Sequence, residues 1–149
     1  MVALAGAFLV AGIGGALTDT GPWFRALNKP AWQPPDSVFG PVWTTLYALI
    51  AASAALAWYD ARNAKQRIVV VALFVLNAVL NAGWSLLFFH LQRPLWALAE
   101  IAVLWLATAA LIAVLWPFSR RAAVLLLPYL LWISFAAALN FEIVRLNPA

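Results

Sequence analysis

The sequence has no cysteine, a single histidine and only five acidic residues in 149 positions. Without cysteine, disulfide bonds, thiolate metal sites and cysteine nucleophiles are excluded. Charged residues of both signs make up 9% of the chain, whereas a soluble domain carries about 25%. Because so few polar side chains cannot cover a water-soluble fold, the composition indicates an integral membrane protein.

Long apolar runs fill most of the sequence instead. Five segments reach the length of about 20 residues that a membrane-spanning helix needs; they are residues 2–18, 38–59, 68–90, 95–116 and 122–144. The connections are short except for residues 19–37. We therefore expect one all-α domain over residues 1–149, a bundle of five transmembrane helices with a structured loop between the first and second. The first segment lacks the basic start of a signal peptide, which argues against its cleavage.

The basic residues divide between the two ends of the predicted helices. Five fall on the side of the N-terminus and four on the other. The positive-inside rule therefore favours, by a narrow margin, a cytoplasmic N-terminus. Nothing indicates a basic patch for nucleic acid, so no nucleic-acid partner is expected. The two groups are Arg62, Lys65, Arg67, Arg120 and Arg121, and Arg25, Lys29, Arg93 and Arg145.

Three of the predicted helices carry an aromatic and polar stripe at helical spacing. Unpaired amides at mid-membrane depth cost several kcal/mol, so the polar stripes must face the bundle interior. Hydrogen bonding between helices is one explanation for them. The other is a cavity for a flat, hydrophobic ligand with a few polar atoms. The stripes are Trp43 and Tyr47; Asn77, Asn81, Trp84, Ser85 and Phe88; and Tyr129, Trp132, Ala136 and Asn140.

The loop before the second helix has an unusual composition. Residues 27–47, LNKPAWQPPDSVFGPVWTTLY, contain four prolines, which preset φ and restrict the residues before them. Such a loop is stiff, and it carries Trp23 and Trp32. We expect it to lie over the mouth of the cavity as a lid, where Lys29 or Arg25 meets an acidic group of the ligand.

Three further features stand out within the apolar segments. Glu100 is an acid inside a span, a functional candidate by default, and we expect it to pair with Arg93 or His90. Pro128 lacks the N–H that would bond to the carbonyl of Val124, so it should kink its helix. Small residues four apart in the first segment predict either a dimer seam or close packing within the monomer. They are Ala3, Ala7, Ala11 and Gly15.

Three separated motifs cover most of the chain from Trp23 to Asn147. The first is Trp23–Phe24, Leu27, Lys29–Pro30, Trp32, Pro34–Pro35, Phe39, Val42–Trp43 and Leu46–Tyr47. The second is Asn81–Ala82–Gly83–Trp84–Ser85 with Phe88–Phe89, and the third is Pro128–Tyr129, Trp132, Ala136 and Leu139–Asn140. In these motifs the chain resembles the tryptophan-rich sensory protein / translocator protein family, TspO/MBR, whose animal members were called peripheral benzodiazepine receptors.

The resemblance implies a five-helix bundle, usually a homodimer, with a pocket beneath the loop after the first helix. Family members bind porphyrins such as protoporphyrin IX, and isoquinoline and benzodiazepine drugs. Porphyrin is then a ligand and not a covalent cofactor, and no metal is implied. Some members bind sterols, but Phe141 stands where the family's sterol motif has a tyrosine, and such motifs are weak. By position, the pocket residues would be Trp23, Trp32, Trp43, Tyr47, Asn81, Phe88, Trp132 and Ala136.

Three function classes follow from these observations. The leading hypothesis is a membrane receptor that senses, sequesters or moves porphyrin, or regulates tetrapyrrole metabolism. The alternative is an enzyme that degrades protoporphyrin IX oxidatively under light, with Trp43 and Trp132 as reactive groups. The sequence offers no metal-ligand cluster and no nucleophile with a base, and His90, at a helix end, is typical of an interface residue. A transporter or channel is the third class, although one intramembrane acid gives no evident ion pathway.

Overall fold

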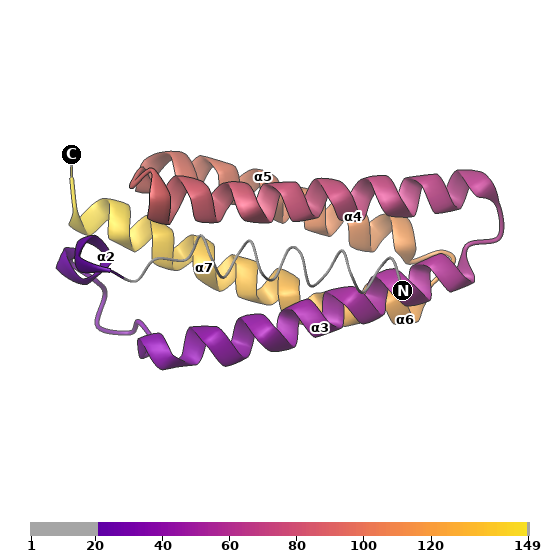
Figure 1. The fold of residues 1–149 in the computed structure, drawn as a ribbon, viewed down its shortest axis with the longest axis horizontal. Coiled ribbons are helices and arrows are strands. Elements are labelled where there is room, and N and C mark those ends of the chain that lie inside the picture. Colours follow the sequence, from indigo (N-terminus) through magenta and orange to yellow (C-terminus); the bar gives the residue numbers. More distant parts are fainter. Residues whose placement is uncertain (1–20, 149) are drawn as a thin grey trace.

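The computed structural model describes residues 21–148, and these residues form helices joined by short loops, with no strand among them (Figure 1). Four helices are long and apolar enough to cross a membrane: Asp36–Asp60, Ala64–His90, Pro94–Leu115 and Arg120–Leu146. Four of the five predicted spans are thereby confirmed. The fifth, residues 2–18 with its small-residue stripe, lies outside the described residues. The elements are α2 (Pro22–Ala26), α3 (Asp36–Asp60), α4 (Ala64–Ser85), η1 (Leu86–His90), α5 (Pro94–Leu115), α6 (Arg120–Leu125) and α7 (Leu127–Leu146).

The spans run up and down along one long axis, and α5 packs against both α4 and α7, whereas α3 packs mainly on α6 (Figure 1). One face of α5 is buried at helical spacing by Leu104, Leu111 and Leu115, which meet Tyr129 and Ile133 of α7 in the core. This face is the stripe that a helix presents to its neighbours. Packing in the interior therefore fixes the rotation of each span about its axis.

The outer surface of the bundle is apolar. An exposed aliphatic stripe runs along α4 and consists of Ile68, Val71, Val75 and Val79. An apolar surface of this size is unfavourable in water but favourable against lipid chains. Tryptophans expected at the membrane interfaces lie at helix ends and are exposed; they are Trp58, Trp96 and Trp116. The chain is an integral, multi-pass membrane protein.

Two prolines shape the spans. Pro41 was expected in the first turn of its helix, but α3 begins at Asp36, directly after Pro35, so Pro41 lies inside it. The acidic Asp36 in the first turn favours this earlier start through the helix dipole. Near Pro128, where a kink was expected, the helix of the last span is interrupted at Leu126, between α6 and α7.

The span of α4 ends in a wider helical turn. In η1 the N–H of Leu91 donates to the carbonyl of Leu86 at 2.8 Å, a bond over five residues that defines a π-helical turn. The turn buries both Phe88 and Phe89, whose rings meet edge to face with centroids 4.9 Å apart. Sequence periodicity did not indicate this turn.

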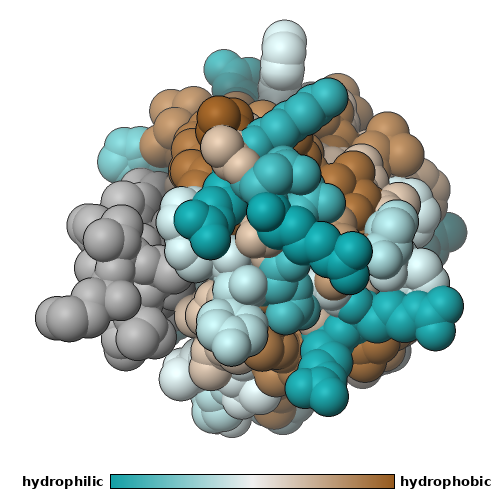
Figure 2. Space-filling view, turned by 90° about the vertical axis from the view of Figure 1, so that its right-hand side faces the viewer, coloured by the Kyte–Doolittle hydropathy of each residue, from teal (hydrophilic) through white to brown (hydrophobic). Residues whose placement is uncertain are grey.

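Successive spans alternate in direction, so every second connection lies at the same end of the bundle. The two ends carry different side chains. The α3–α4 and α5–α6 connections meet at one end, where hydrophilic side chains gather (Figure 2). This end carries Arg62, Lys65, Arg67, Arg120 and Arg121, as the sequence predicted. The opposite end holds α2, η1 and the C-terminus of α7 (Figure 1).

Candidate ligand-binding site

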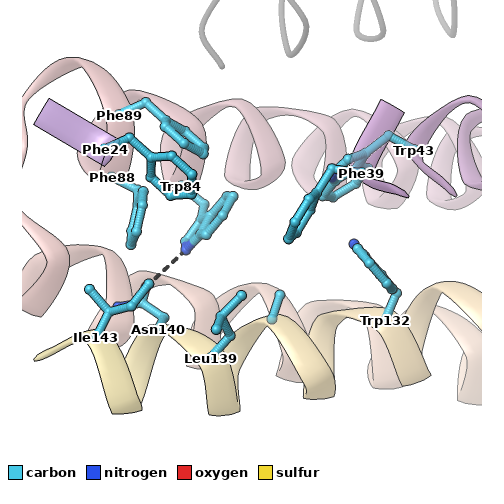
Figure 3. Close-up of a pocket in the computed structure, with 11 residues that line it drawn as sticks. Phe24, Phe39, Trp43, Trp84, Phe88, Phe89, Trp132, Leu139, Asn140 and Ile143 are labelled. Carbon is cyan, nitrogen blue, oxygen red and sulfur yellow. Dashed lines mark hydrogen bonds between the residues drawn. The ribbon is translucent and has the colours of Figure 1, made fainter. Parts of the chain in front are cut away.

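An aromatic cavity lies at the end of the bundle that holds α2, between α3, η1 and α7 (Figure 3). Its free volume is about 60 Å³, whereas pockets for drug-sized ligands measure roughly 300 to 1,000 Å³. The aromatic side chains themselves fill most of the space between the helices. The lining residues are Phe24, Phe39, Trp43, Trp84, Phe88, Phe89, Trp132, Ala136, Leu139, Asn140 and Ile143.

The α3 and α7 sides of the cavity meet through two indoles. Trp43 stacks on Tyr47, with centroids 5.4 Å apart and planes at 27°, and it meets Trp132 edge to face at 6.4 Å. Phe39 contacts the other side of this group, 5.9 Å from Trp132. The aromatic stripes predicted for the second and fifth helices therefore face each other across the cavity.

Aromatic rings of α4, η1 and α2 form the opposite side. Trp84 stacks on Phe88 at 5.3 Å, and Phe24 of α2 lies 5.5 Å from Phe89. Trp23 packs edge to face on Phe88 from outside the lining, at 5.9 Å. The short helix α2 is thus held on η1 by ring contacts, and it closes this side of the cavity.

Two polar side chains of the lining, Trp84 and Asn140, form hydrogen bonds. The indole N–H of Trp84 donates to Oδ1 of Asn140 at 3.1 Å (Figure 3), and Nδ2 of Asn140 donates to the carbonyl of Pro94 at 2.9 Å. This chain of bonds joins α4, α7 and α5. A ligand would therefore meet a largely apolar wall, whose polar features are the Trp84–Asn140 pair and the indole nitrogen of Trp132, which points into the space between the helices (Figure 3).

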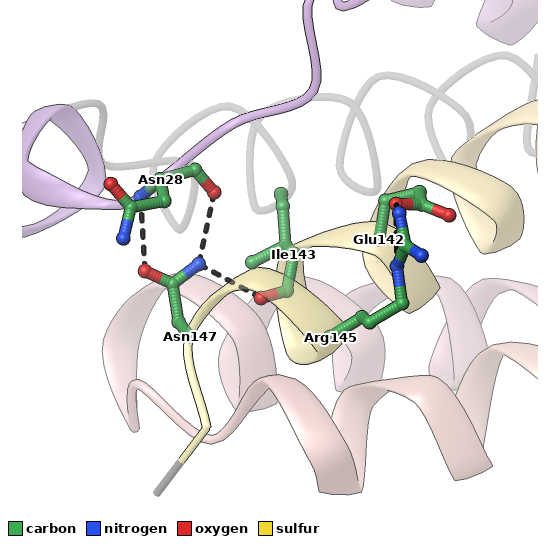
Figure 4. Close-up of polar contacts among 5 residues, drawn as sticks. All are labelled: Asn28, Glu142, Ile143, Arg145 and Asn147. Carbon is green, nitrogen blue, oxygen red and sulfur yellow. Dashed lines mark hydrogen bonds and ion pairs between the residues drawn. The ribbon is translucent and has the colours of Figure 1, made fainter.

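The loop after α2 is fastened to the C-terminal end of α7 by two asparagines (Figure 4). The backbone N–H of Asn28 donates to Oδ1 of Asn147 at 2.9 Å, and Nδ2 of Asn147 donates back to the carbonyl of Asn28 at 2.9 Å. The same Nδ2 also donates to the carbonyl of Ile143 at 2.8 Å. Further along the loop, Trp32 meets Phe135 of α7 at 5.7 Å. The loop lies over this end of the bundle, where a lid was expected.

The structure brings half of the eight predicted pocket residues to the cavity lining. Trp43, Phe88, Trp132 and Ala136 line it. The other four lie outside the lining, and three of them pack on aromatic side chains around it: Trp23 on Phe88, Tyr47 on Trp43 and Trp32 on Phe135. The fourth, Asn81, donates to the hydroxyl of Tyr129 at 2.9 Å.

Seven lining residues were absent from the predicted set. Trp84 and Asn140 stand on the inward stripes, so the sequence did signal them, and Ile143 extends the Asn140 stripe by one turn. Phe24 and Phe39 belong to the proline-rich stretch, whose fold cannot be deduced from helical spacing. The full set is Phe24, Phe39, Trp84, Phe89, Leu139, Asn140 and Ile143.

The amide stripe of α4 holds the helices together away from the cavity. Nδ2 of Asn77 donates to Oγ1 of Thr108 on α5 at 2.7 Å, and Asn81 reaches Tyr129 of α7. Both asparagines are buried. Hydrogen bonding between helices, the first explanation for this stripe, accounts for these two residues.

Glu100 does not form the predicted pair with Arg93 or His90. Both carboxylate oxygens of Glu100 are buried without a hydrogen-bond partner. Among residues 21–148, the salt bridge that the structure shows joins Arg145 to another acid, Glu142, at 2.7 Å. The side chain turns instead toward α4, where a Cβ added to Gly83 would lie 3.7 Å from Oε1 of Glu100. Arg93 is two helical turns away along α5, which explains why the pair does not form.

Comparisons with known proteins cover most of the chain. Residues 1–146 match the sequence model of the TspO/MBR family. The tryptophan-rich protein TspO of Chlorobaculum tepidum is 40% identical over 126 residues, which span 85% of this chain and 80% of the relative. The protein of the same name from Archaeoglobus fulgidus is 44% identical over 125 residues, 84% of this chain and 80% of the relative. The translocator protein of Homo sapiens is 36% identical over 126 residues, 84% of this chain and 75% of the relative.

Proposed function

The chain belongs to the TspO/MBR family, and from that premise we propose that it is a membrane receptor or sensor that binds porphyrins such as protoporphyrin IX. Related flat, hydrophobic molecules would occupy the same site. The observation that carries this proposal is the meeting of Trp43, Trp84, Phe88 and Trp132 around one cavity. Residues 2–18 would supply the fifth span, and two copies would associate as a homodimer.

Recognition at this site would rest on ring faces and shape. Large aromatic faces stack on flat π-systems, and each such pair contributes roughly 0.5–1.5 kcal/mol beyond its buried area. None of the described lining residues carries an ionisable side chain. The acidic groups of a porphyrin would therefore reach the rim, where Nζ of Lys29 lies 3.8 Å from the ring centroid of Phe24.

Entry of a porphyrin requires the cavity to open. About 60 Å³ is free, several times less than a drug-sized ligand occupies. The parts best placed to move are α2, which contributes Phe24, and the loop fastened at Asn28. Displacing them would separate Phe24 from η1 and admit a flat ligand between the indoles of α3 and α7.

The enzymatic alternative draws support from one observation. Trp43 and Trp132, the two indoles considered as reactive groups, line the same cavity and meet at 6.4 Å. A bound porphyrin would lie against both of them. An illuminated sample of protein and protoporphyrin IX, compared with a dark one, separates the two functions: stable porphyrin bands support binding alone, and loss of the bands that depends on Trp43 and Trp132 supports degradation.

Tryptophan fluorescence of the detergent-solubilised protein tests the binding proposal. Titration with protoporphyrin IX should quench it saturably with a dissociation constant of about 1 µM, or about −8 kcal/mol. Ala136→Phe, which fills the cavity, should abolish saturable quenching. Ala138→Phe is the matched control, because Ala138 is exposed on the same helix. Linear quenching without saturation in the parent, or unchanged binding in Ala136→Phe, would contradict the proposal.

A further inference from the structure

A second hollow lies at the opposite, basic end, between the end of α3 and the turn from α5 to α6. It measures about 710 Å³, against about 60 Å³ for the aromatic cavity. Neither the family resemblance nor the proposed porphyrin site involves it. Its lining residues are Leu56, Tyr59, Asp60, Pro117, Phe118, Ser119, Arg120 and Arg121; we call this hollow the basic cleft.

The charge of the basic cleft is unbalanced. Arg120 and Arg121 line it with a single carboxylate, Asp60, and that carboxylate accepts a hydrogen bond from the hydroxyl of Ser119 at 2.6 Å. Neither arginine forms a salt bridge with any residue in the described part of the chain. Three further cations, Arg62, Lys65 and Arg67, belong to the α3–α4 connection and the first turn of α4, at the same end of the bundle. Within residues 21–148, the cleft therefore presents two guanidinium groups that form no salt bridge and a single carboxylate that is hydrogen-bonded to Ser119.

One side of the basic cleft is apolar and lies at the depth of a membrane interface. Leu56, Pro117 and Phe118 form this side. Two exposed indoles outside the lining lie at the same end of the spans, each beneath a guanidinium: the Arg120 guanidinium carbon lies 5.7 Å from the Trp116 ring centroid and that of Arg67 lies 5.2 Å from the Trp58 ring centroid. Exposed tryptophans at span ends mark the level where headgroups meet acyl chains.

We propose that the basic cleft binds the headgroup of an anionic membrane phospholipid. The phosphate would accept hydrogen bonds from Arg120 and Arg121, since the planar guanidinium matches phosphate oxygens in pairs. The start of the acyl chains would lie along Leu56 and Phe118. An anionic protein or a nucleic acid would use the charges but leave the apolar side of the cleft and the exposed indoles at this end of the spans without a role. Basic pockets between spans at this depth suit lipid phosphates.

Native mass spectrometry of the full-length protein in detergent, with added phosphatidylglycerol or phosphatidylcholine, tests the proposal. The parent should retain phosphatidylglycerol at concentrations where phosphatidylcholine is lost. Arg120→Gln/Arg121→Gln should weaken retention at least about tenfold, because each basic residue near a membrane anion contributes to binding. Arg62→Gln/Lys65→Gln is the matched control: it removes the same charge from the same end but outside the lining, and it should retain the lipid.

The outcomes separate the sources of anion binding. Equal loss in both double variants would show a diffuse positive field and overturn the site, as would equal retention of the two lipids by the parent. Displacement of phosphatidylglycerol by an equal concentration of inorganic phosphate would show a free-anion site and overturn the lipid assignment. If the arginine double variant does not fold, Arg121→Gln alone leaves the Arg120–Trp116 contact in place; unchanged retention in that variant contradicts the proposal.

Discussion

Among single residues, tryptophan serves two different purposes in this protein, and its surroundings decide which. Trp132 is partly buried, packed between Phe39, Trp43 and Phe135 beside the cavity. Trp96 is 67% exposed in the first turn of α5, where an indole anchors the helix end at the interface. The two residues have the same chemistry, but only Trp132 can stack on a ligand in the cavity.

Replacing Trp132 by alanine should therefore weaken porphyrin binding about tenfold, given roughly 0.5–1.5 kcal/mol for a lost stacked contact in addition to its buried area. Trp96→Ala removes an indole as well and should bind like the parent. Protoporphyrin IX titration of both variants, each checked by a thermal melting curve, measures the difference. Equal affinities in both variants would show that the ligand lies elsewhere.

Glu100 gives a prediction about stability. Its carboxylate oxygens are buried without a partner, and an unsatisfied buried polar group costs about 1–3 kcal/mol. Glu100→Leu should therefore raise the melting temperature in detergent. Glu142→Leu, which removes the partner of Arg145, should leave it unchanged or lower it slightly, since exposed ion pairs contribute about 0–1 kcal/mol. A lower melting temperature for Glu100→Leu would mean that the carboxylate stabilises the fold.

Whole elements were predictable from the sequence where they cross the membrane. The predicted segments 38–59 and 95–116 match Asp36–Asp60 and Pro94–Leu115 closely, because apolar length and flanking prolines mark the ends of a span. The short helix α2 was not predictable, since a helix of five residues depends on contacts such as Phe24 on Phe89. The π-helical turn η1 likewise depends on packing.

The candidate site was predictable only in part, for a related reason. Helical spacing shows which face of a span is turned inward, and Trp43 and Trp132, which stand on predicted inward stripes, both line the cavity. Spacing does not show how far along a span the cavity extends. Tyr47 was therefore included in the predicted pocket, although it stacks on Trp43 outside the lining. Helical spacing also gives no information on the fold of the loop. The hydrogen bonds between Asn28 and Asn147, which are 119 positions apart, could therefore not be predicted from the sequence.

The contact between the loop and α7 should control how often the loop opens. Asn147→Ala removes three side-chain hydrogen bonds, two to Asn28 and one to Ile143, each with a net value of roughly 0.5–1.5 kcal/mol. Amide hydrogen exchange at Asn28 and nearby loop positions should accelerate about tenfold. The measurement is hydrogen–deuterium exchange with mass spectrometry on the detergent-solubilised protein.

Asn63→Ala is the control for this prediction. The side chain of Asn63 caps α4 at the other end by accepting a hydrogen bond from the N–H of Gln66 at 2.9 Å. Its loss should destabilise α4 by about 1 kcal/mol without accelerating exchange in the loop after α2. If Asn147→Ala leaves loop exchange at the parental rate, the ring contacts of Trp23 and Phe24 hold the loop without the asparagines.

For the molecule as a whole, the alternation of spans places the loop and cavity at one end and the basic cleft at the other. By five basic residues against four, the positive-inside rule predicts that the basic end faces the cytoplasm. The absence of cysteine makes this directly testable, because any introduced cysteine is the sole thiol. Ala64→Cys at the basic end and Ala31→Cys in the loop are a matched pair of exposed positions.

In intact cells, a membrane-impermeant maleimide should label Ala31→Cys, and Ala64→Cys should react only after the membrane is opened. Inverted membrane vesicles should give the reverse pattern and serve as the control. Labelling of Ala64→Cys in intact cells, with protection of Ala31→Cys, would show that the protein has the opposite orientation in the membrane. The basic cleft would then face the other leaflet.

The closed state of the aromatic cavity, with about 60 Å³ free, has a consequence for kinetics. A ligand that binds only the open form associates no faster than the protein opens, so the observed rate should level off as the ligand concentration rises. The apparent affinity falls by the fraction of open molecules; an open population of about 1% raises the dissociation constant about a hundredfold. A substitution that favours the open form would thus tighten binding without touching the ligand.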